Sequence, residues 1–169
     1  MILWMDRALL VRILLWYNVV SLGIWAGGTV YQMAVIVPLW SASPPESVRA
    51  FFQGTAFMQT IHSFFGPVTQ VARALPLFIL VAVAWRYHNV RWWIAACAST
   101  MVLGLIMTRA YIYPMNDVLF DKAGGDLGAD GVRALVRAWI IADRVRFAIM
   151  SGGYLCLLRA FSLPLAAPH

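Results

Sequence analysis

The stretch ILLWYNVVSLGIWAGGTVYQMAVIVPLW, residues 13–40, contains no charged side chain and decides the fold class. A helix needs about 20 consecutive apolar residues to cross the hydrocarbon core of a bilayer, so this stretch predicts a membrane span. It is too long for the apolar core of a signal peptide, although Arg7 and Arg12 precede it. We therefore interpret it as a retained first span.

The composition of the whole chain agrees with a membrane protein. Of its 169 residues, 62% are hydrophobic and 12% are charged, whereas soluble domains carry about 25% charged residues. The net charge of +6 is spread along the chain, which argues against a nucleic-acid partner. Cys97 and Cys156 lie in apolar runs without C-x-x-C spacing, so we expect neither a disulfide scaffold nor a thiolate metal site.

The same length criterion predicts four spans within one domain, residues 1–169. The spans lie at about 13–40, 57–85, 92–113 and 138–158, and Pro114 is expected to end the third. We expect an all-α, integral membrane four-helix bundle with a short extra helix, 131–137, in the loop before the fourth span. Asp130 is the expected cap of that short helix. A small excess of basic residues on the side of the termini predicts that both termini are cytoplasmic.

The first span contains a G-x-x-x-G motif at Gly23 and Gly27, extended by Gly28. Such glycines let two helix backbones approach closely. Packing within the chain and a contact in a homo-oligomer are the two alternatives.

Several charged side chains lie at membrane depth, and the basic ones outnumber the acidic one: Arg73, Arg109, Asp143, Arg144 and Arg146. A charge at the centre of a bilayer costs roughly 3 kcal/mol or more, so it usually faces a protein interior and serves a function. Between Arg146 and Arg159 there is roughly 18 Å of helix, too little to cross a core of about 30 Å. Arg146 is therefore expected within the membrane, and the same argument applies to Arg73. Arg144 is expected to snorkel. Arg109 is expected at the rim, and snorkelling of its head to the interface is the alternative there.

The polar residues of the second and fourth predicted spans recur at steps of three and four, as on one helix face. The second span contributes His62, Gln70 and Arg73, and the fourth contributes Trp139, Asp143 and Arg146. In lipid such faces point into the bundle, and Tyr31 of the first span lies at a similar depth. The pattern predicts a cavity that suits an anion. An ion-pair network of Asp143 with Arg73 or Arg146, which only fixes the helices, is the alternative.

His62 is a candidate general base because an unperturbed imidazole titrates near neutrality. A hydrogen-bonded histidine that packs between helices is the alternative. The chain has 3 histidines, and His88 and His169 lie in a loop and at the terminus. We therefore expect no multi-histidine metal site, while a haem with one axial ligand stays open.

Short motifs of the chain match a known family. They are Gly27-Gly28-Thr29-Val30-Tyr31 with Pro38 and Trp40, then Arg109 with Tyr113-Pro114-Met115-Asn116, and finally Trp139 and Arg146. These residues resemble the anthrone oxygenase-like family of small four-span membrane proteins, many of which have no assigned function. The resemblance implies a four-helix bundle that oxidises anthrones to anthraquinones with molecular oxygen, without an obvious metal or flavin motif. It implies Arg109, Asn116, Trp139 and Arg146 as pocket residues.

The expected function is therefore that of a membrane-embedded oxidoreductase acting on a lipophilic, anthrone- or quinone-like substrate. Arg73, Gln70 and Tyr31 join the expected substrate-binding residues, and His62 or Asp143 is the expected base. Removing a proton from the substrate gives an enolate, which arginines in a low-dielectric pocket stabilise as an oxyanion hole does. We expect no cofactor besides the co-substrate oxygen. The alternatives are a glutathione-using four-span membrane transferase and a non-catalytic scaffold whose arginines hold lipid head groups.

Overall fold

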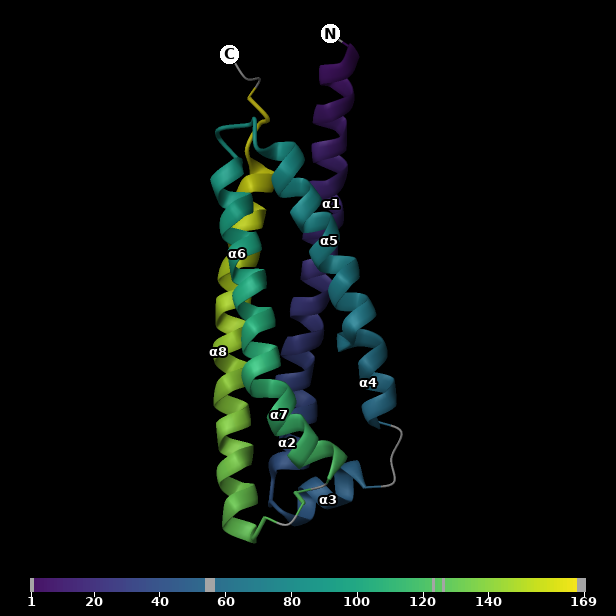
Figure 1. Cartoon of the computed structure of the whole chain (residues 1–169), viewed down its shortest axis with the longest axis vertical. Helices are drawn as coiled ribbons and strands as arrows, with labels where there is room; N and C mark the ends of the chain where they lie inside the picture. Colours follow the sequence, from purple (N-terminus) through teal and green to yellow (C-terminus); the bar gives the residue numbers. More distant parts are fainter. Residues whose placement is uncertain (1, 54–56, 123, 126, 167–169) are drawn as a thin grey trace.

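The computed structural model describes residues 2–53, 57–122, 124–125 and 127–166, without the side chains of residues 2–6, 58, 59 and 62. All regular structure in these ranges is helical. The longest helices run along one axis, and the first and last described residues lie at the same end of it, called here the terminal end (Figure 1). The other end is called the distal end. The elements are α1 (Ile2–Tyr31), η1 (Gln32–Ile36), α2 (Val37–Ser41), α3 (Glu46–Phe52), α4 (Phe57–Phe65), α5 (Pro67–Ala84), α6 (Arg91–Met107), η2 (Thr108–Ile112), α7 (Tyr113–Asn116), η3 (Asp117–Asp121) and α8 (Ala129–Ser162), where η marks a π-helical segment.

Three helical stretches are long and apolar enough to cross a membrane, judged by length and composition. They are Arg7–Ser41, Ser63–Ala84 and Arg91–Asp121. These stretches make the chain a membrane protein. Helix α8 has 34 residues but carries Asp143, Arg144 and Arg146 near its middle, and it is not among the three. That it forms a fourth span stays a prediction.

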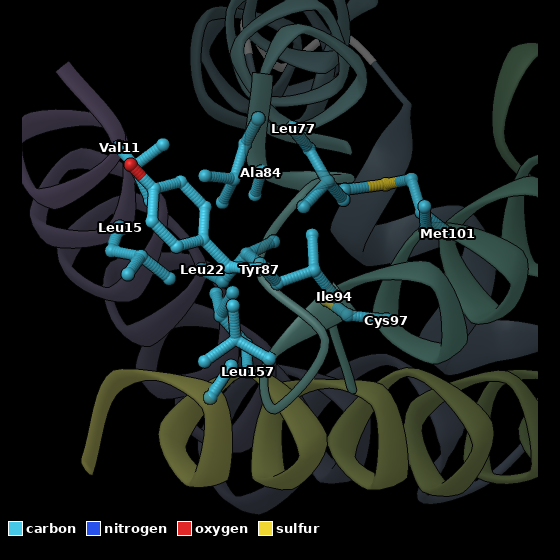
Figure 2. Close-up of a cluster of buried hydrophobic side chains, with 14 residues drawn as sticks. Val11, Leu15, Leu22, Leu77, Ala84, Tyr87, Ile94, Cys97, Met101 and Leu157 are labelled. Atoms are coloured by element: carbon cyan, nitrogen blue, oxygen red, sulfur yellow. The ribbon is translucent and has the colours of Figure 1, made fainter. Parts of the chain in front are cut away.

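The core of the terminal half joins four helices through apolar side chains (Figure 2). Helices α1, α5, α6 and α8 all contribute, together with the 85–90 turn. The members that Figure 2 labels are Val11, Leu15, Leu22, Leu77, Ala84, Tyr87, Ile94, Cys97, Met101 and Leu157. Burial of this kind positions the four helices relative to one another and leaves their distal halves to form the site.

Small residues set the closest approach of α6 and α8. A Cβ atom added at Gly153 would overlap the Thr100 side chain, and one added at Gly104 would lie 2.7 Å from the Met150 sulfur. The G-x-x-x-G motif of α1 packs in part within the chain, since Gly23 faces the Tyr154 hydroxyl and Gly28 faces the Phe64 ring. Gly27 has no neighbour within 4 Å. Oligomer contact at Gly27 stays a prediction.

Pro114 does not end its helix, contrary to the expectation from the sequence. The segment η2 precedes it, and the Tyr113 N–H bonds to the Thr108 carbonyl five residues back. Proline lacks an N–H and clashes with the carbonyl four residues earlier in a regular α-helix. The wider π turn relieves that clash, so the helix continues through α7 and η3 to Asp121. The same device precedes Pro38, where the Val37 N–H bonds to the Gln32 carbonyl.

The stretch expected as one helix, 57–85, is divided at Gly66. This residue is extended, with φ −74° and ψ 178°, and it stands directly before Pro67, the first residue of α5. A residue before proline avoids the α conformation for steric reasons. The stretch therefore forms two helices, α4 and α5, instead of one.

The short helix expected at 131–137 is not separate: it is the beginning of α8, which starts at Ala129. Gly128 occupies the cap position, and Asp130 bonds instead to Arg133, with 2.7 Å between Oδ1 and Nη1. No proline interrupts the chain between Gly131 and the predicted fourth span, so the helix runs on. A short helix that is separate from the long ones, α3, lies at the distal end (Figure 1).

Candidate functional site

A cavity of about 110 Å³ lies in the distal half, between α1–η1–α2, α4–α5, α6–η2–α7 and α8. Its distal wall is aromatic and tightly packed. The ring of Trp40 contacts those of Phe120 and Trp139 edge to face, with centroids 5.4 and 5.2 Å apart, and Phe52 stacks on Phe120 at 4.3 Å. Its polar side chains are Gln32, Gln70, Arg73, Thr108, Tyr113, Asn116, Trp139 and Arg146.

The π segments supply two faces of this cavity. Gln32 and Ile36 come from η1, and Thr108 and Ile112 come from η2. Insertions of this kind in α-helices occur frequently at functional sites, because they re-aim the side chains that follow. The two prolines after them therefore help to shape the cavity.

Arg146 of α8 is held by two partners. One guanidinium nitrogen, Nη1, donates to the Thr108 hydroxyl at 3.0 Å, and Nη2 donates to Asp143 Oδ1. The ion pair with Asp143 neutralises one charge, and Asp143 is 1% exposed. Asp143 does not line the cavity but lies behind Arg146. Its Oδ2 atom and the Arg146 Nε atom are buried without a hydrogen-bond partner in the described part of the chain.

Arg73 of α5 also lines the cavity, and it is 9% exposed. Among the described residues it has no ion-pair or hydrogen-bond partner. Because the pair of Arg146 with Asp143 is neutral, Arg73 gives the cavity an uncompensated positive charge. A buried cation without a partner is unfavourable unless an anion binds beside it.

Hydrogen bonds fix which polar atoms face the cavity. The Trp139 indole N–H donates to Asn116 Oδ1 at 2.7 Å, and since an indole is only a donor, the amide NH₂ of Asn116 remains available. Gln70 Nε2 donates to the Phe65 carbonyl at 3.0 Å and to the Tyr113 hydroxyl oxygen at 3.2 Å. The Tyr113 O–H is then free to donate. The lining therefore offers mainly donors, which suits an oxyanion or a carbonyl oxygen.

Five of the residues chosen from the sequence line the cavity: Gln70, Arg73, Asn116, Trp139 and Arg146. Arg109 does not line it; it is exposed, and its guanidinium lies 5.3 Å from the centre of the Tyr113 ring. Tyr31 is 58% exposed and also lies outside the lining. His62 belongs to α4, but its side chain lies outside the described part of the structure.

Sequence reasoning did not select Thr108 or Tyr113 as site residues. The steps from Met101 through Gly104 to Thr108 and Ile112, each of three or four residues, mark one helix face and could have found Thr108. Within the described residues, no group of three or more His, Cys, Asp or Glu side chains could hold a metal ion.

The chain is similar in sequence to a known protein family. A sequence model of the family described as anthrone oxygenase matches residues 54–156. The matched range contains Gln70, Arg73, Thr108, Asn116 and Arg146. No curated protein and no solved structure matches the chain.

Proposed function

The chain belongs to the anthrone oxygenase family, and on that premise we propose that it is a membrane-embedded oxygenase of a lipophilic, enolisable aromatic compound. The single observation that carries the proposal is the buried Arg73, which has no ion-pair or hydrogen-bond partner among the described residues and lies in a cavity lined by hydrogen-bond donors. Such a cavity stabilises negative charge that develops on an oxygen. The aromatic distal wall suits the flat, apolar body of the same substrate.

The reaction balances with molecular oxygen as co-substrate. A base removes a proton from the methylene that lies opposite the carbonyl in the central ring. The electron pair is delocalised through the fused aromatic rings onto the carbonyl oxygen, which gives an enolate. The methylene carbon then becomes a second carbonyl. One atom of O₂ enters that carbonyl, the other leaves with the two hydrogens as water, and the electrons lost by carbon are those gained by oxygen. Arg73 and the donors beside it would hold the enolate oxygen.

The base in this scheme is best sought in His62. Asp143 was the other candidate, but its carboxylate is paired with Arg146 and does not line the cavity. A role that fits its position is to orient the Arg146 guanidinium, with Thr108 as the second anchor. Asp143 would then be a positioning residue, and its loss would affect binding through Arg146.

We also propose that α8 is the fourth span. The charged residues near its middle are compatible with this. Asp143 is neutralised by Arg146, both of these side chains face the protein, and the exposed Arg144 is expected to snorkel. Paired charges that point into a bundle are tolerated within a membrane. Membrane burial of α8 would place the cavity between four spans.

The proposal is tested with 1,8-dihydroxyanthrone as the probe substrate. The purified protein in detergent is expected to increase oxygen consumption and anthraquinone formation above the spontaneous rate, with one water formed for each O₂ consumed. Arg73→Gln should reduce kcat/KM by about 100-fold, which corresponds to about 2.7 kcal/mol of lost oxyanion stabilisation. Arg144→Gln, on the exposed side of α8, is the matched control and should behave as the wild-type protein. A wild-type rate equal to the spontaneous one would refute the proposal for this substrate class, and equal effects of the two substitutions would refute the role of Arg73.

A further inference from the structure

A second hollow lies on the outside of the molecule, between α1 and α5. This groove has a volume of about 540 Å³ and is lined mainly by apolar side chains. Among them Trp16, Val20 and Ile24 of α1 are 59%, 51% and 59% exposed. They lie within the stretch Arg7–Ser41, which is apolar enough to cross a membrane. In a bilayer the groove would therefore face acyl chains rather than water.

Arg73 is shared by the groove and the cavity and lines both. Around it, the junction of α4 and α5 separates the two spaces. Phe64 lines the groove and its neighbour Phe65 lines the cavity, with ring centroids 4.7 Å apart. Phe64 also packs on Gly28, where any added side chain would displace its ring. The side chains at this helix break therefore lie between the groove and the cavity.

The opposite approach to the cavity is more obstructed. At the distal end the packed rings of Trp40, Phe52, Phe120 and Trp139 form the wall, and α3 packs against it. Rings in such edge-to-face contact, in a cluster with few gaps, resist separation. A lipophilic molecule dissolved in the bilayer would meet the apolar groove first.

We propose that the groove between α1 and α5 is a lateral entrance, through which the lipophilic aromatic substrate passes from the bilayer into the cavity. The inference rests on the proposed function and names the substrate's route. The aromatic body lies along Val20 and Ile24, and its acidic oxygen meets the unpaired Arg73 at the inner end of the groove. The same guanidinium then holds that oxygen on the cavity side.

The experiment measures binding, not turnover. The probe is 1,8-dihydroxyanthraquinone, whose own fluorescence is followed by stopped flow with the full chain in phosphatidylcholine nanodiscs. Val20→Trp fills the groove from the lipid side at an exposed position, and Ile24→Trp is a second variant of the same kind. Val102→Trp is the matched control, because Val102 is 40% exposed on α6 and lines neither space.

An obstructed entrance slows entry and exit alike. Both rate constants should fall at least about tenfold in Val20→Trp and Ile24→Trp while their ratio, the dissociation constant, stays the same. Val102→Trp should match the wild-type protein. Arg73→Gln should weaken binding itself, so its dissociation constant should rise. Unchanged rate constants in the two groove variants would overturn the entrance.

Two further outcomes would also overturn it. A phospholipid that stays on the wild-type protein through delipidation and is lost from Val20→Trp would show that the groove holds a structural lipid. Failure of the wild-type protein to bind the probe would overturn both the entrance and the proposed cavity. Binding of the probe without oxidation of 1,8-dihydroxyanthrone would refute the proposed function, and the rate constants would still decide the route.

Discussion

At the scale of the residue, the two arginines of the cavity should affect stability in opposite directions. Arg73 is buried and has no ion-pair or hydrogen-bond partner among the described residues, whereas Arg146 neutralises the buried Asp143. Replacing Arg73 by leucine removes an uncompensated charge, so we expect ligand-free Arg73→Leu to gain on the order of 1–3 kcal/mol. Arg146→Leu leaves Asp143 without its partner and should lose about 3–5 kcal/mol. Thermal unfolding in detergent measures both.

Comparing Arg73→Leu with Arg146→Leu distinguishes an anion-binding site from an ion-pair network that only holds the helices together. If Arg73 only fixed helices, Arg73→Leu would lower the unfolding temperature as Arg146→Leu does. That result would contradict the proposal that the cavity binds an anion. The double variant Arg146→Leu/Asp143→Leu serves as control, since it removes both members of the ion pair and should recover most of the stability lost in Arg146→Leu.

Trp139 and Asn116 allow a second prediction at this scale. Trp139→Phe keeps the aromatic packing with Trp40 but removes the N–H that bonds to Asn116 Oδ1. We expect a loss of about 1–2 kcal/mol in stability, because the amide oxygen loses its donor. Probe binding should also weaken, because the amide is no longer oriented. The double variant Trp139→Phe/Asn116→Leu should regain stability but not binding; recovery of both would show that Asn116 does not contact the ligand.

The sequence predicted the charged residues of the cavity better than it predicted which residue after α6 faces the cavity. Arg73 and Arg146 followed from the length of helix between charges, which is independent of local geometry. Arg109 was expected in the pocket from the family resemblance, but its neighbour Thr108 lines the cavity instead. The segment η2 begins at Thr108, and a π turn holds more residues than an α turn. Because the π turn starts only at Thr108, the regular steps Met101, Gly104 and Thr108 already mark the helix face that lines the cavity.

At the scale of the element, the contact of α6 with α8 depends on Gly153. A methyl group there would overlap the Thr100 side chain, so Gly153→Ala should destabilise the protein by about 1–3 kcal/mol through overpacking. Its neighbour Gly152 has nothing within 4 Å of the same position. Gly152→Ala should be neutral or stabilising by up to about 1 kcal/mol from helix propensity.

Thermal unfolding of the two alanine variants checks this contact. Thr100→Ala combined with Gly153→Ala should restore part of the stability, because the smaller side chain makes room. Equal unfolding temperatures for Gly152→Ala and Gly153→Ala would mean that α6 and α8 do not approach as closely as described.

The sequence predicted the long helices but not where they continue or break. The apolar runs indicated the long helices, because hydrophobic length is read directly from composition. The continuation of the helix past Pro114 could not be predicted from the sequence, because proline normally ends a helix. Here the π turn before Pro114 relieves the clash. The break at Gly66 was missed although the Gly-Pro pair signals it. The G-x-x-x-G motif drew attention to α1, whereas among the described glycines Gly153 of α8 leaves the least room, against Thr100 of α6.

At the scale of the whole molecule, α8 extends over the same length as the predicted spans. Leu157 belongs to the core shared with α1, α5 and α6 near the terminal end, and Trp139 belongs to the aromatic wall at the distal end. Both termini of the described chain lie at the terminal end (Figure 1). Helix α8 packs along α1 and α6, which belong to stretches that are long and apolar enough to span the bilayer, so we expect α8 to cross it as well.

Cysteine labelling tests this topology, including the cytoplasmic termini expected from the sequence. In a Cys97→Ala/Cys156→Ala background, single cysteines at the exposed positions 43, 88, 127 and 166 mark the distal loops, the 85–90 turn and the C-terminal segment. With a membrane-impermeant maleimide on intact cells, Ser43→Cys and Leu127→Cys should react. His88→Cys and Ala166→Cys should react only after permeabilisation, because the basic terminal end is retained in the cytoplasm. Reaction of Ala166→Cys together with Leu127→Cys would contradict the fourth span, and reaction of His88→Cys on intact cells would reverse the orientation.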